Sequence, residues 1–400
     1  MGGIKRRELM KAATVGGITL SIAGAATRLL SNKARAQGAS QPTAWPNKRL
    51  LQLLKIEHPI IQAPMGLHTG PDMPVAVCKA GGLGSFPCAG LTPAQLRDVV
   101  AKIRAQTTKP LNLNFFIPVT QRDAAVEAAW LKRLANYYTE LGVNPPAFPA
   151  STPPPFGTEI CDVVVELKPQ VVSFHVGLPD KSLVDRLKAA GCLIFGSATT
   201  VAEARWLEEH GVDAVIAQGV EAGGHRGMFL TTELASQLGT LALVPQVADA
   251  VKVPVIAAGG IADGRGIAAA FALGASAVQM GTAYLDCPEA PISAQLRAAL
   301  RSAKERITTV SNVVSGRPAR VFMNRIVREV GPIATDVPSF PLGAVALAPL
   351  RAKAESQGSD DFSGLYAGQA AALGRELPAG ELTLRLAAET LERFASLTRA

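Results

Sequence analysis

The chain has 400 residues, of which 48% are hydrophobic and 5% aromatic, and its formal net charge is +8. This composition excludes a disordered or fibrous protein and suits one large α/β barrel of roughly 250 residues with additions. The five cysteines are odd in number and scattered through apolar stretches. We therefore expect small core residues rather than a disulfide framework.

The amino-terminal segment is strongly basic. Lys5-Arg6-Arg7 leads into a Gly/Ala/Thr-rich stretch, and Ala34-Arg35-Ala36 precedes Gln37. Residues 1–36 resemble a twin-arginine export signal with a small-x-small cleavage site. The middle of the segment is too short and glycine-rich for a membrane span, so no stable anchor is expected after cleavage. An ordinary amphipathic helix is the alternative.

Export changes the charge argument. Residues 1–36 hold seven Lys/Arg against one Glu, which is +6 of the total +8, so the remainder carries about +2. No basic patch for nucleic acid is left, and we expect no nucleic-acid partner. The expected location is periplasmic or exported, with the twin-arginine machinery as a partner. This route carries folded proteins, commonly with a cofactor inserted.

After a linker at 37–49, short apolar runs alternate with helical patterns. The runs expected as strands are 58–65, 82–87, 111–117, 171–176, 192–197, 214–218, 254–258 and 277–281. Helical stretches such as 92–106, 182–190, 201–210 and 265–273 lie between them. Eight strands in regular alternation with helices predict a parallel (β/α)8 TIM barrel over residues 50–282.

Two segments depart from this alternation. Residues 118–170 carry a helical stretch and a proline-rich loop at 144–156, and are expected to be an insertion. Residues 283–400 combine helical segments with a Pro/Gly/Ser-rich loop at 331–364. We expect them to form a mostly helical domain that covers the barrel mouth and the substrate.

A lone histidine follows the sixth expected strand. The stretch reads Gln218-Gly-Val-Glu-Ala-Gly-Gly-His225-Arg-Gly, so that His225 stands behind Gly223 and Gly224. The carboxyl ends of barrel strands build the active site, which makes His225 a candidate catalytic base. The two glycines would let the backbone approach a ligand closely. A loop histidine that merely bonds a carbonyl is the structural alternative.

The loops after the last two expected strands are rich in glycine. Gly259 and Gly260 follow the seventh strand, and the eighth ends in Gln279-Met280-Gly281-Thr282. Barrels that bind phosphate use these two loops, whose backbone N–H groups meet the anion. The run at 264–269 also matches a dinucleotide fingerprint, but a Rossmann unit does not fit the seventh of eight similar repeats. The histidines form no ligand pair, so no catalytic metal is expected.

Several motifs, in order along residues 50–390, are similar to those of the nitronate monooxygenase family of flavin mononucleotide (FMN) enzymes. They are Gln62-Ala-Pro-Met65, Asn112-Leu-Asn114-Phe-Phe116, Gln218 to Gly227, Ala258-Gly-Gly-Ile261, Gln279-Met-Gly-Thr282, Ser315-Gly-Arg-Pro-Ala-Arg320 and Leu365-Tyr-Ala-Gly-Gln369.

The resemblance implies roles for individual residues. His225 matches the family's catalytic histidine, and Tyr366 and Gln369 match a motif near the substrate. The residues that the resemblance places at FMN are Ala63, Pro64, Met65, Asn114, Gln218, Gly223, Gly224, Gly259, Gly260, Gln279, Met280, Gly281 and Thr282. The implied reaction oxidises an alkyl nitronate, or a nitroalkane, with O2 to a carbonyl compound and nitrite.

Two other functions stay open on the sequence. One is a flavin-dependent NAD(P)H enoyl-thioester reductase, which is a related barrel with a similar Gly-Gly-His stretch. The other is an exported protein that binds flavin or an anion without turnover, because a fold does not guarantee catalysis.

Overall fold

The computed structural model describes residues 44–117, 120–151 and 156–397. Residues 44–400 form one compact unit by themselves. The predicted signal at 1–36 and most of the expected linker lie outside the described residues. Within the described part, no helix is both long and apolar enough to cross a membrane. All five cysteines are free and buried.

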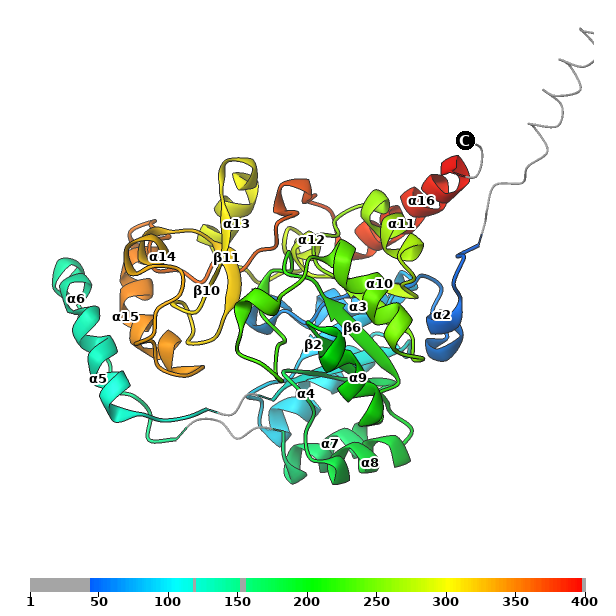
Figure 1. Cartoon of the computed structure of the whole chain (residues 1–400), viewed down its shortest axis with the longest axis horizontal. Coiled ribbons are helices and arrows are strands. Elements are labelled where there is room, and N and C mark those ends of the chain that lie inside the picture. Colours follow the sequence, from blue (N-terminus) through cyan, green and yellow to red (C-terminus); the bar gives the residue numbers. More distant parts are fainter. Residues whose placement is uncertain (1–43, 118–119, 152–155, 398–400) are drawn as a thin grey trace, which may run out of the picture. The chain divides into compact units, whose positions relative to one another are not determined.

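The core of the unit is a parallel barrel, as the sequence predicts (Figure 1). Its strands are β1 (Ile60–Gln62), β2 (Gly84–Pro87), β3 (Leu111–Phe116), β4 (Val171–His175), β5 (Leu193–Ala198), β6 (Ala214–Gln218), β8 (Val255–Ala258) and β9 (Ala277–Met280). They pair in the order β1-β9-β8-β6-β5-β4-β3-β2. A parallel bridge between Ile61 and Leu83 joins β1 to β2 and closes the ring. The strands are short and almost wholly buried, as expected where helices cover the outside and side chains fill the inside.

A layer of helices surrounds the strands. Its members are α3 (Asp72–Lys79), α4 (Pro93–Arg104), α7 (Thr158–Leu167), α8 (Lys181–Ala189), α9 (Val201–Glu209), α10 (Thr240–Ala250), α11 (Gly264–Ala272) and α16 (Ala379–Leu397). Local signals define several starts: Thr92 and Gln95 form a capping box at α4, and Asp263 caps α11.

The helical layer corrects two expected boundaries. Helix α7 contributes Cys161 and Val164 to the barrel core, so the insertion is narrower than 118–170. Helix α16 packs Leu382 and Leu386 into the same core, and the Thr383 hydroxyl lies 2.8 Å from that of Tyr284. Residues 283–400 are therefore not one covering domain, because α16 lies against α11 and α3 in the barrel (Figure 1). An amphipathic pattern identifies a helix but not the surface that it covers.

The insertion and the part of residues 283–400 that precedes α16 are together called the covering unit below. This region contains more β-strand than expected. A three-stranded antiparallel sheet joins β10 (Thr308–Ser311), β11 (Ala319–Phe322) and β7 (Gly224–His225). The other helices of these segments are α5 (Ala124–Arg133), α6 (Ala135–Leu141), α13 (Ala294–Arg301), α14 (Arg325–Val330) and α15 (Leu342–Ser356), while the short α12 (Thr282–Leu285) places Ala283 and Tyr284 in the barrel core. Trp130 and Tyr138 of the insertion share a core cluster with Val327 and Leu350. The insertion thus belongs to the covering unit.

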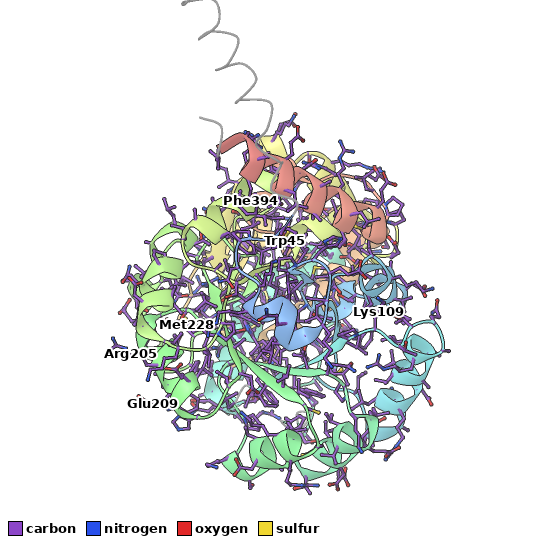
Figure 2. The ribbon with its side chains drawn as sticks, turned by 90° about the vertical axis from the view of Figure 1, so that its right-hand side faces the viewer. Trp45, Lys109, Arg205, Glu209, Met228 and Phe394 are labelled. Carbon is purple, nitrogen blue, oxygen red and sulfur yellow. The ribbon has the colours of Figure 1, made fainter. Side chains whose placement is uncertain are left out.

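The opposite end of the barrel is closed by the residues that follow the undescribed segment. Helix α2 (Arg49–Leu54) packs Leu50 and Leu54 against Ile61 and neighbouring strand residues. Trp45, with an exposed fraction of 6%, lies 5.5 Å from Phe271 and 6.2 Å from Phe394 between ring centroids. Figure 2 shows Trp45 close to Phe394 of α16. This anchor ties the start of the described chain to the helical layer.

Candidate active site

His225 lies where the barrel and the covering unit meet. It follows the carboxyl end of β6, and the short β7 pairs with β11, with His225 opposite Ala319 and Gly224 opposite Arg320. The loop after a barrel strand therefore also serves as an edge strand of the covering sheet. This pairing joins the backbone of the predicted catalytic residue to β11, while side chains of the barrel strands, His175 and Gln218, reach the carbonyl oxygen of His225.

The two glycines before His225 are needed for different reasons. A Cβ at Gly223 would lie 2.5 Å from the backbone nitrogen of Gly368, so this position has no room for a side chain. Gly224 has open space around it but adopts φ +78°, which favours glycine. The close neighbour of Gly223 on this side is therefore the carboxyl-terminal segment at Gly368.

Aromatic rings enclose His225. The centroids of Phe116, Phe340 and Tyr366 lie 5.5, 5.0 and 5.4 Å from the His225 ring. Burial, with smaller contributions from His175 and Arg317, lowers the pKa of His225 to about 3. His225 is consequently a neutral imidazole at neutral pH.

The hydroxyl of Ser315 defines which His225 nitrogen carries the proton. His225 Nε2 lies 2.9 Å from Ser315 Oγ, and that oxygen lies 3.3 Å from the carbonyl oxygen of Arg317. The Ser315 hydroxyl has a carbonyl acceptor in Arg317 and also hydrogen-bonds Tyr366; with its hydrogen directed to either of them, Ser315 Oγ accepts from His225 Nε2–H. The lone pair of the neutral ring is then on Nδ1, which is free to act as a base.

Three arginines surround this loop, and sequence reasoning gave them no role. Arg226 is fully buried, and its guanidinium donates to the carbonyl oxygens of Gly219 (3.0 Å) and Gln218 (2.9 Å). Arg320 donates to Val220 O at 2.7 Å, and Arg317 donates to the backbone of the His225 loop. A buried arginine that binds carbonyl oxygens fixes a loop and adds positive charge beside the site. The only sequence signal for a role of these arginines was their presence in two of the quoted motifs, Gln218 to Gly227 and Ser315 to Arg320.

The glycine loops after β8 and β9 have the properties of an anion site. Gly259 and Gly260 adopt φ +114° and +68°. Within the described part of the chain, the backbone N–H groups of Gly260, Gly281 and Thr282 donate to no acceptor. Amides left free at the ends of these strands suit a phosphate group. The short helix α12 begins at Thr282, as in barrels that bind phosphate.

Gln279 supplies an independent sign of a missing ligand. Its Oε1 atom is buried and has no hydrogen-bond partner among the described residues. A buried acceptor without a donor is costly, and a ribityl hydroxyl or ring N–H of a flavin would satisfy it. These residues therefore fit an FMN molecule, with its phosphate at the glycine loops and polar groups at Gln279.

The remaining residues predicted to bind FMN differ in how far their side chains are already used within the protein. Gly281 lies beside Ala63 and Met65, since a Cβ there would be 3.6 Å from Ala63 Cβ and 3.7 Å from Met65 Sδ. Asn114 donates through Nδ2 to Ser173 Oγ at 2.9 Å. Gln218 accepts from Gly227 N at 2.8 Å and donates to His225 O at 3.1 Å. One hydrogen of its amide nitrogen remains for a ligand, so Gln218 mainly positions the His225 loop. Pro64 and Met280 complete the two loops, and Met280 O accepts from Ala63 N at 2.8 Å.

The two weaker substrate candidates are separated. Tyr366 is beside His225, and its ring centroid is also 6.3 Å from that of His68. Gln369 is exposed and lines a different cavity of about 250 Å³. Its backbone N–H donates to Glu221 O at 2.9 Å, so Gln369 joins the segment to the barrel through its backbone.

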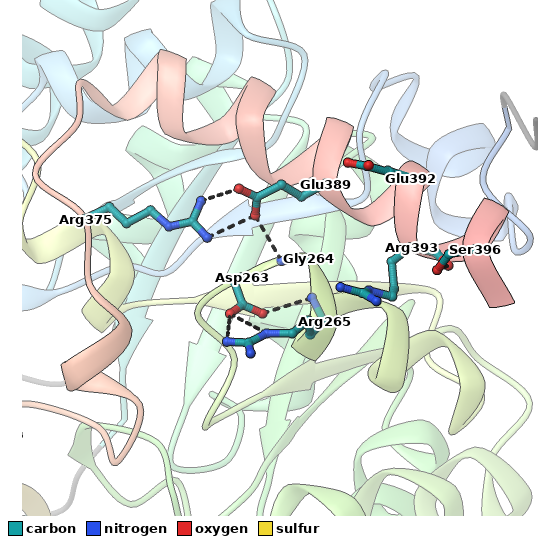
Figure 3. Close-up of a pocket in the computed structure, with 8 residues that line it drawn as sticks. All are labelled: Asp263, Gly264, Arg265, Arg375, Glu389, Glu392, Arg393 and Ser396. Carbon is teal, nitrogen blue, oxygen red and sulfur yellow. Dashed lines mark hydrogen bonds and ion pairs between the residues drawn. The ribbon is translucent and has the colours of Figure 1, made fainter.

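A larger cleft of about 400 Å³ lies between α11 and α16 (Figure 3). Arg375 and Asp263 are both paired, with Glu389 and Arg265 respectively. A Cβ at Gly264 would lie 2.7 Å from Glu389. Gly264, the first glycine of the run at 264–269 that matches a dinucleotide fingerprint, therefore allows α11 to pack closely against α16. The cleft contains none of the residues around His225.

Comparisons with known proteins agree with this geometry. A family model described as nitronate monooxygenase matches residues 47–389. A nitronate monooxygenase of Paraburkholderia phytofirmans is 43% identical over 354 residues, which cover 88% of this chain and 97% of the relative. One of Pseudomonas aeruginosa is 42% identical over 85% of this chain and 98% of the relative.

Solved structures have the same architecture. Nitroalkane oxidase from Streptomyces ansochromogenes aligns with a TM-score of 0.80 at 37% identity, over 87% of this chain and 99% of that one. FabK from Thermotoga maritima aligns with a TM-score of 0.69 at 30% identity, over 89% and 99%.

Proposed function

The chain belongs to the nitronate monooxygenase family of FMN-dependent oxidoreductases, and we propose that it oxidises alkyl nitronates with O2 to a carbonyl compound and nitrite. The observation that carries this function is the neutral His225, held among aromatic rings and beside loops that fit FMN. When bound, FMN supplies the oxidation of the nitronate and passes electrons to oxygen.

The residues of this chain bind and orient the substrate. A nitronate is an anion, and the enclosed site excludes water from it, which strengthens interactions with the surrounding dipoles and positive charge. Arg226, Arg317 and Arg320 supply that charge without contacting the ring of His225. Phe116 and Phe340 supply apolar surface for the alkyl group.

His225 extends the substrate range to neutral nitroalkanes. Its Nδ1 lone pair takes the proton from the carbon next to the nitro group, so a C–H bond breaks and an N–H bond forms. The product is an imidazolium beside a nitronate anion, and the charge of the bound nitronate offsets the burial and the neighbouring Arg317 that lower the pKa of the free ring. A nitronate supplied as such needs no proton transfer. We therefore propose His225 as the catalytic base and Tyr366 as a substrate contact.

A direct test uses the purified chain loaded with FMN. Ethyl nitronate should give oxygen consumption together with release of nitrite, balanced as two nitrites and two aldehydes from two nitronates and one O2, whereas nitroethane should depend on His225. The variant H225N should lose most nitroethane turnover, while H210N, at the exposed histidine that follows α9, should behave as the parent. If FMN binds but no nitronate yields nitrite, the assigned reaction is wrong.

The same FMN-loaded protein can be used to distinguish the proposed monooxygenase from an NAD(P)H-dependent enoyl-thioester reductase. FabK shares the fold and 30% identity, which makes this a specific second candidate. Anaerobic NADH or NADPH alone should leave the protein's visible spectrum unchanged, and a short enoyl thioester added afterwards should have no effect on it. Rapid bleaching by either nucleotide, with no nitrite from nitronates, supports the reductase.

We also propose that residues 1–36 direct export through the twin-arginine pathway. The support is the arginine pair followed by the small-x-small site before Gln37. The proposed location is periplasmic or exported.

A further inference from the structure

We propose that His175 is a positioning residue that holds the main chain of His225 for the reaction, an inference that rests on the proposed function. His175 is the last residue of β4, and it has no part in the chemistry described above. Its Nε2 lies 3.1 Å from the carbonyl oxygen of His225. Since that carbonyl can only accept, His175 carries its proton on Nε2.

The carbonyl of His225 receives two donors. Gln218 Nε2 also lies 3.1 Å from it, and Gln218 Oε1 accepts from Gly227 N. One barrel strand thus holds the loop through an amide and another holds it through an imidazole. Together they fix the peptide that carries the His225 side chain.

Packing limits the freedom of both partners. The ring of Phe116 lies 5.2 Å from His175 and 5.5 Å from His225 between centroids. A Cβ at Gly227 would lie 2.9 Å from His175 Cε1, so the loop passes directly over the imidazole. His175 is therefore enclosed by the loop that it binds.

The backbone next to His175 is strained. Val176 has φ +69°, a conformation that is unfavourable for a β-branched residue. The hydrogen bond from Ile117 N to His175 O, at 3.0 Å, holds the strand end in place. Strain of this kind is kept only where the surrounding structure enforces it, and it is concentrated at functional sites. It is a second, independent sign that the direction of His175 matters.

Charge supports a neutral His175. Burial lowers the pKa of His175 to about 4, and the bond to His225 O opposes that shift only in part. The ring remains a donor at Nε2 at neutral pH. It positions without adding charge to the site.

The test uses two amide variants that differ in reach. Glutamine places its amide nitrogen near the position of Nε2, whereas asparagine is shorter and leaves the carbonyl of His225 unreached. H175Q should keep kcat for nitroethane, the substrate that depends on His225, within about threefold of the parent, and H175N should lower it about tenfold with little change in KM. A small misplacement of a catalytic group reduces rates by this order or more.

Controls separate positioning from folding. FMN content and thermal stability are measured for both variants, and H210Q provides a histidine replacement away from the site. Equal kcat values for H175N and H175Q, whether both high or both low, overturn the proposal.

A readout independent of turnover keeps the proposal separate from the assigned reaction. The imidazole ¹⁵N and ¹H resonances of His225, assigned by their loss in H225N, should move in H175N and stay in place in H175Q. Unmoved resonances in H175N also overturn the proposal. If nitronates are not substrates at all, the resonances still decide the role of His175.

Discussion

Ser315 Oγ and His225 Nε2 lie 2.9 Å apart, and this hydrogen bond joins the covering unit to the catalytic loop at the level of side chains. Ser315 is buried, with 1% of its surface exposed, so the ring has a protein partner rather than solvent on that side. With Nε2–H donating to Ser315, the lone pair of the neutral His225 ring is on Nδ1, the nitrogen proposed as the base.

Loss of this bond should affect nitroalkanes more than nitronates. S315A leaves Nε2–H without its partner and permits the other tautomer, so kcat/KM for nitroethane should fall about 10-fold to 100-fold. Ethyl nitronate should change about threefold or less. The measured quantity is the ratio of the two kcat/KM values. S311A removes another buried serine of the same region and should leave that ratio unchanged; an unchanged ratio in S315A contradicts the tautomer assignment.

The two buried histidines should make the fold sensitive to acid. The pKa values of His225 and His175 in the folded protein are about 3 and about 4, below the ordinary value of 6.5. The unfolded chain therefore binds more protons, and the free energy of unfolding is highest above pH 6.5 and falls with decreasing pH. Between pH 7 and pH 5 each histidine should account for about 2 kcal/mol. Urea titrations of the parent and of H175Q/H225N should differ in this slope; parallel slopes argue against neutral buried imidazoles.

Gly223 and Gly224 should respond differently to alanine. G224A has space but an unfavourable φ, and should lose about 1 kcal/mol of unfolding free energy. G223A drives a methyl group into Gly368 and should lose more, about 2 to 3 kcal/mol, because backbone must move. Urea unfolding measures both. The expectation is wrong if G223A is the milder variant.

Gln279 offers a variant with opposite effects on two properties. Q279M keeps the side-chain length but removes the unpartnered Oε1. The protein without FMN should become more stable, by about 1 kcal/mol, whereas FMN should bind about tenfold more weakly. Thermal unfolding without FMN and fluorescence titration with FMN give the two values. Equal FMN affinity in parent and variant excludes Gln279 from the cofactor site.

Export should depend on the arginine pair. Replacing Arg6 and Arg7 together with lysine keeps the charge but removes the pair on which the proposed signal rests. The full chain should then remain in the cytoplasmic fraction of a bacterial host, while R28K should be exported as the parent is. Fractionation followed by immunoblotting measures this, and export of the lysine variant rules out the proposed route.

The barrel was predictable because its signals are local. Each strand such as Ala214–Gln218 is a short apolar run between glycine or capping residues, and the repeat itself defines the ring. The position of His225 followed from the same pattern. The long-range pairing of β7 with β11 was not predictable. Strand β7 is only two residues long, and no pattern near Gly224 indicates that Arg320 is its partner.

Residues that act by burial were also missed. Arg226 reads as a surface cation in the sequence, yet it is fully buried because carbonyl oxygens of its own loop accept from it. Ser315 belongs to the quoted motif Ser315 to Arg320, but no role was predicted for it. A serine in a sequence does not indicate which side chain it contacts, here the imidazole of His225. Gln369 shared a motif with Tyr366 but faces another cavity.

The place of α16 in the barrel has a consequence for biosynthesis. The helix that completes the ring between α11 and α3 comes after the whole covering unit in the sequence, and Phe394 on it meets Trp45 near the start of the described chain. A ribosome must have made nearly all of the chain before the ring can close. Until then α3 and α11 keep an uncovered apolar face, so the incomplete protein exposes apolar surface until its synthesis is nearly finished.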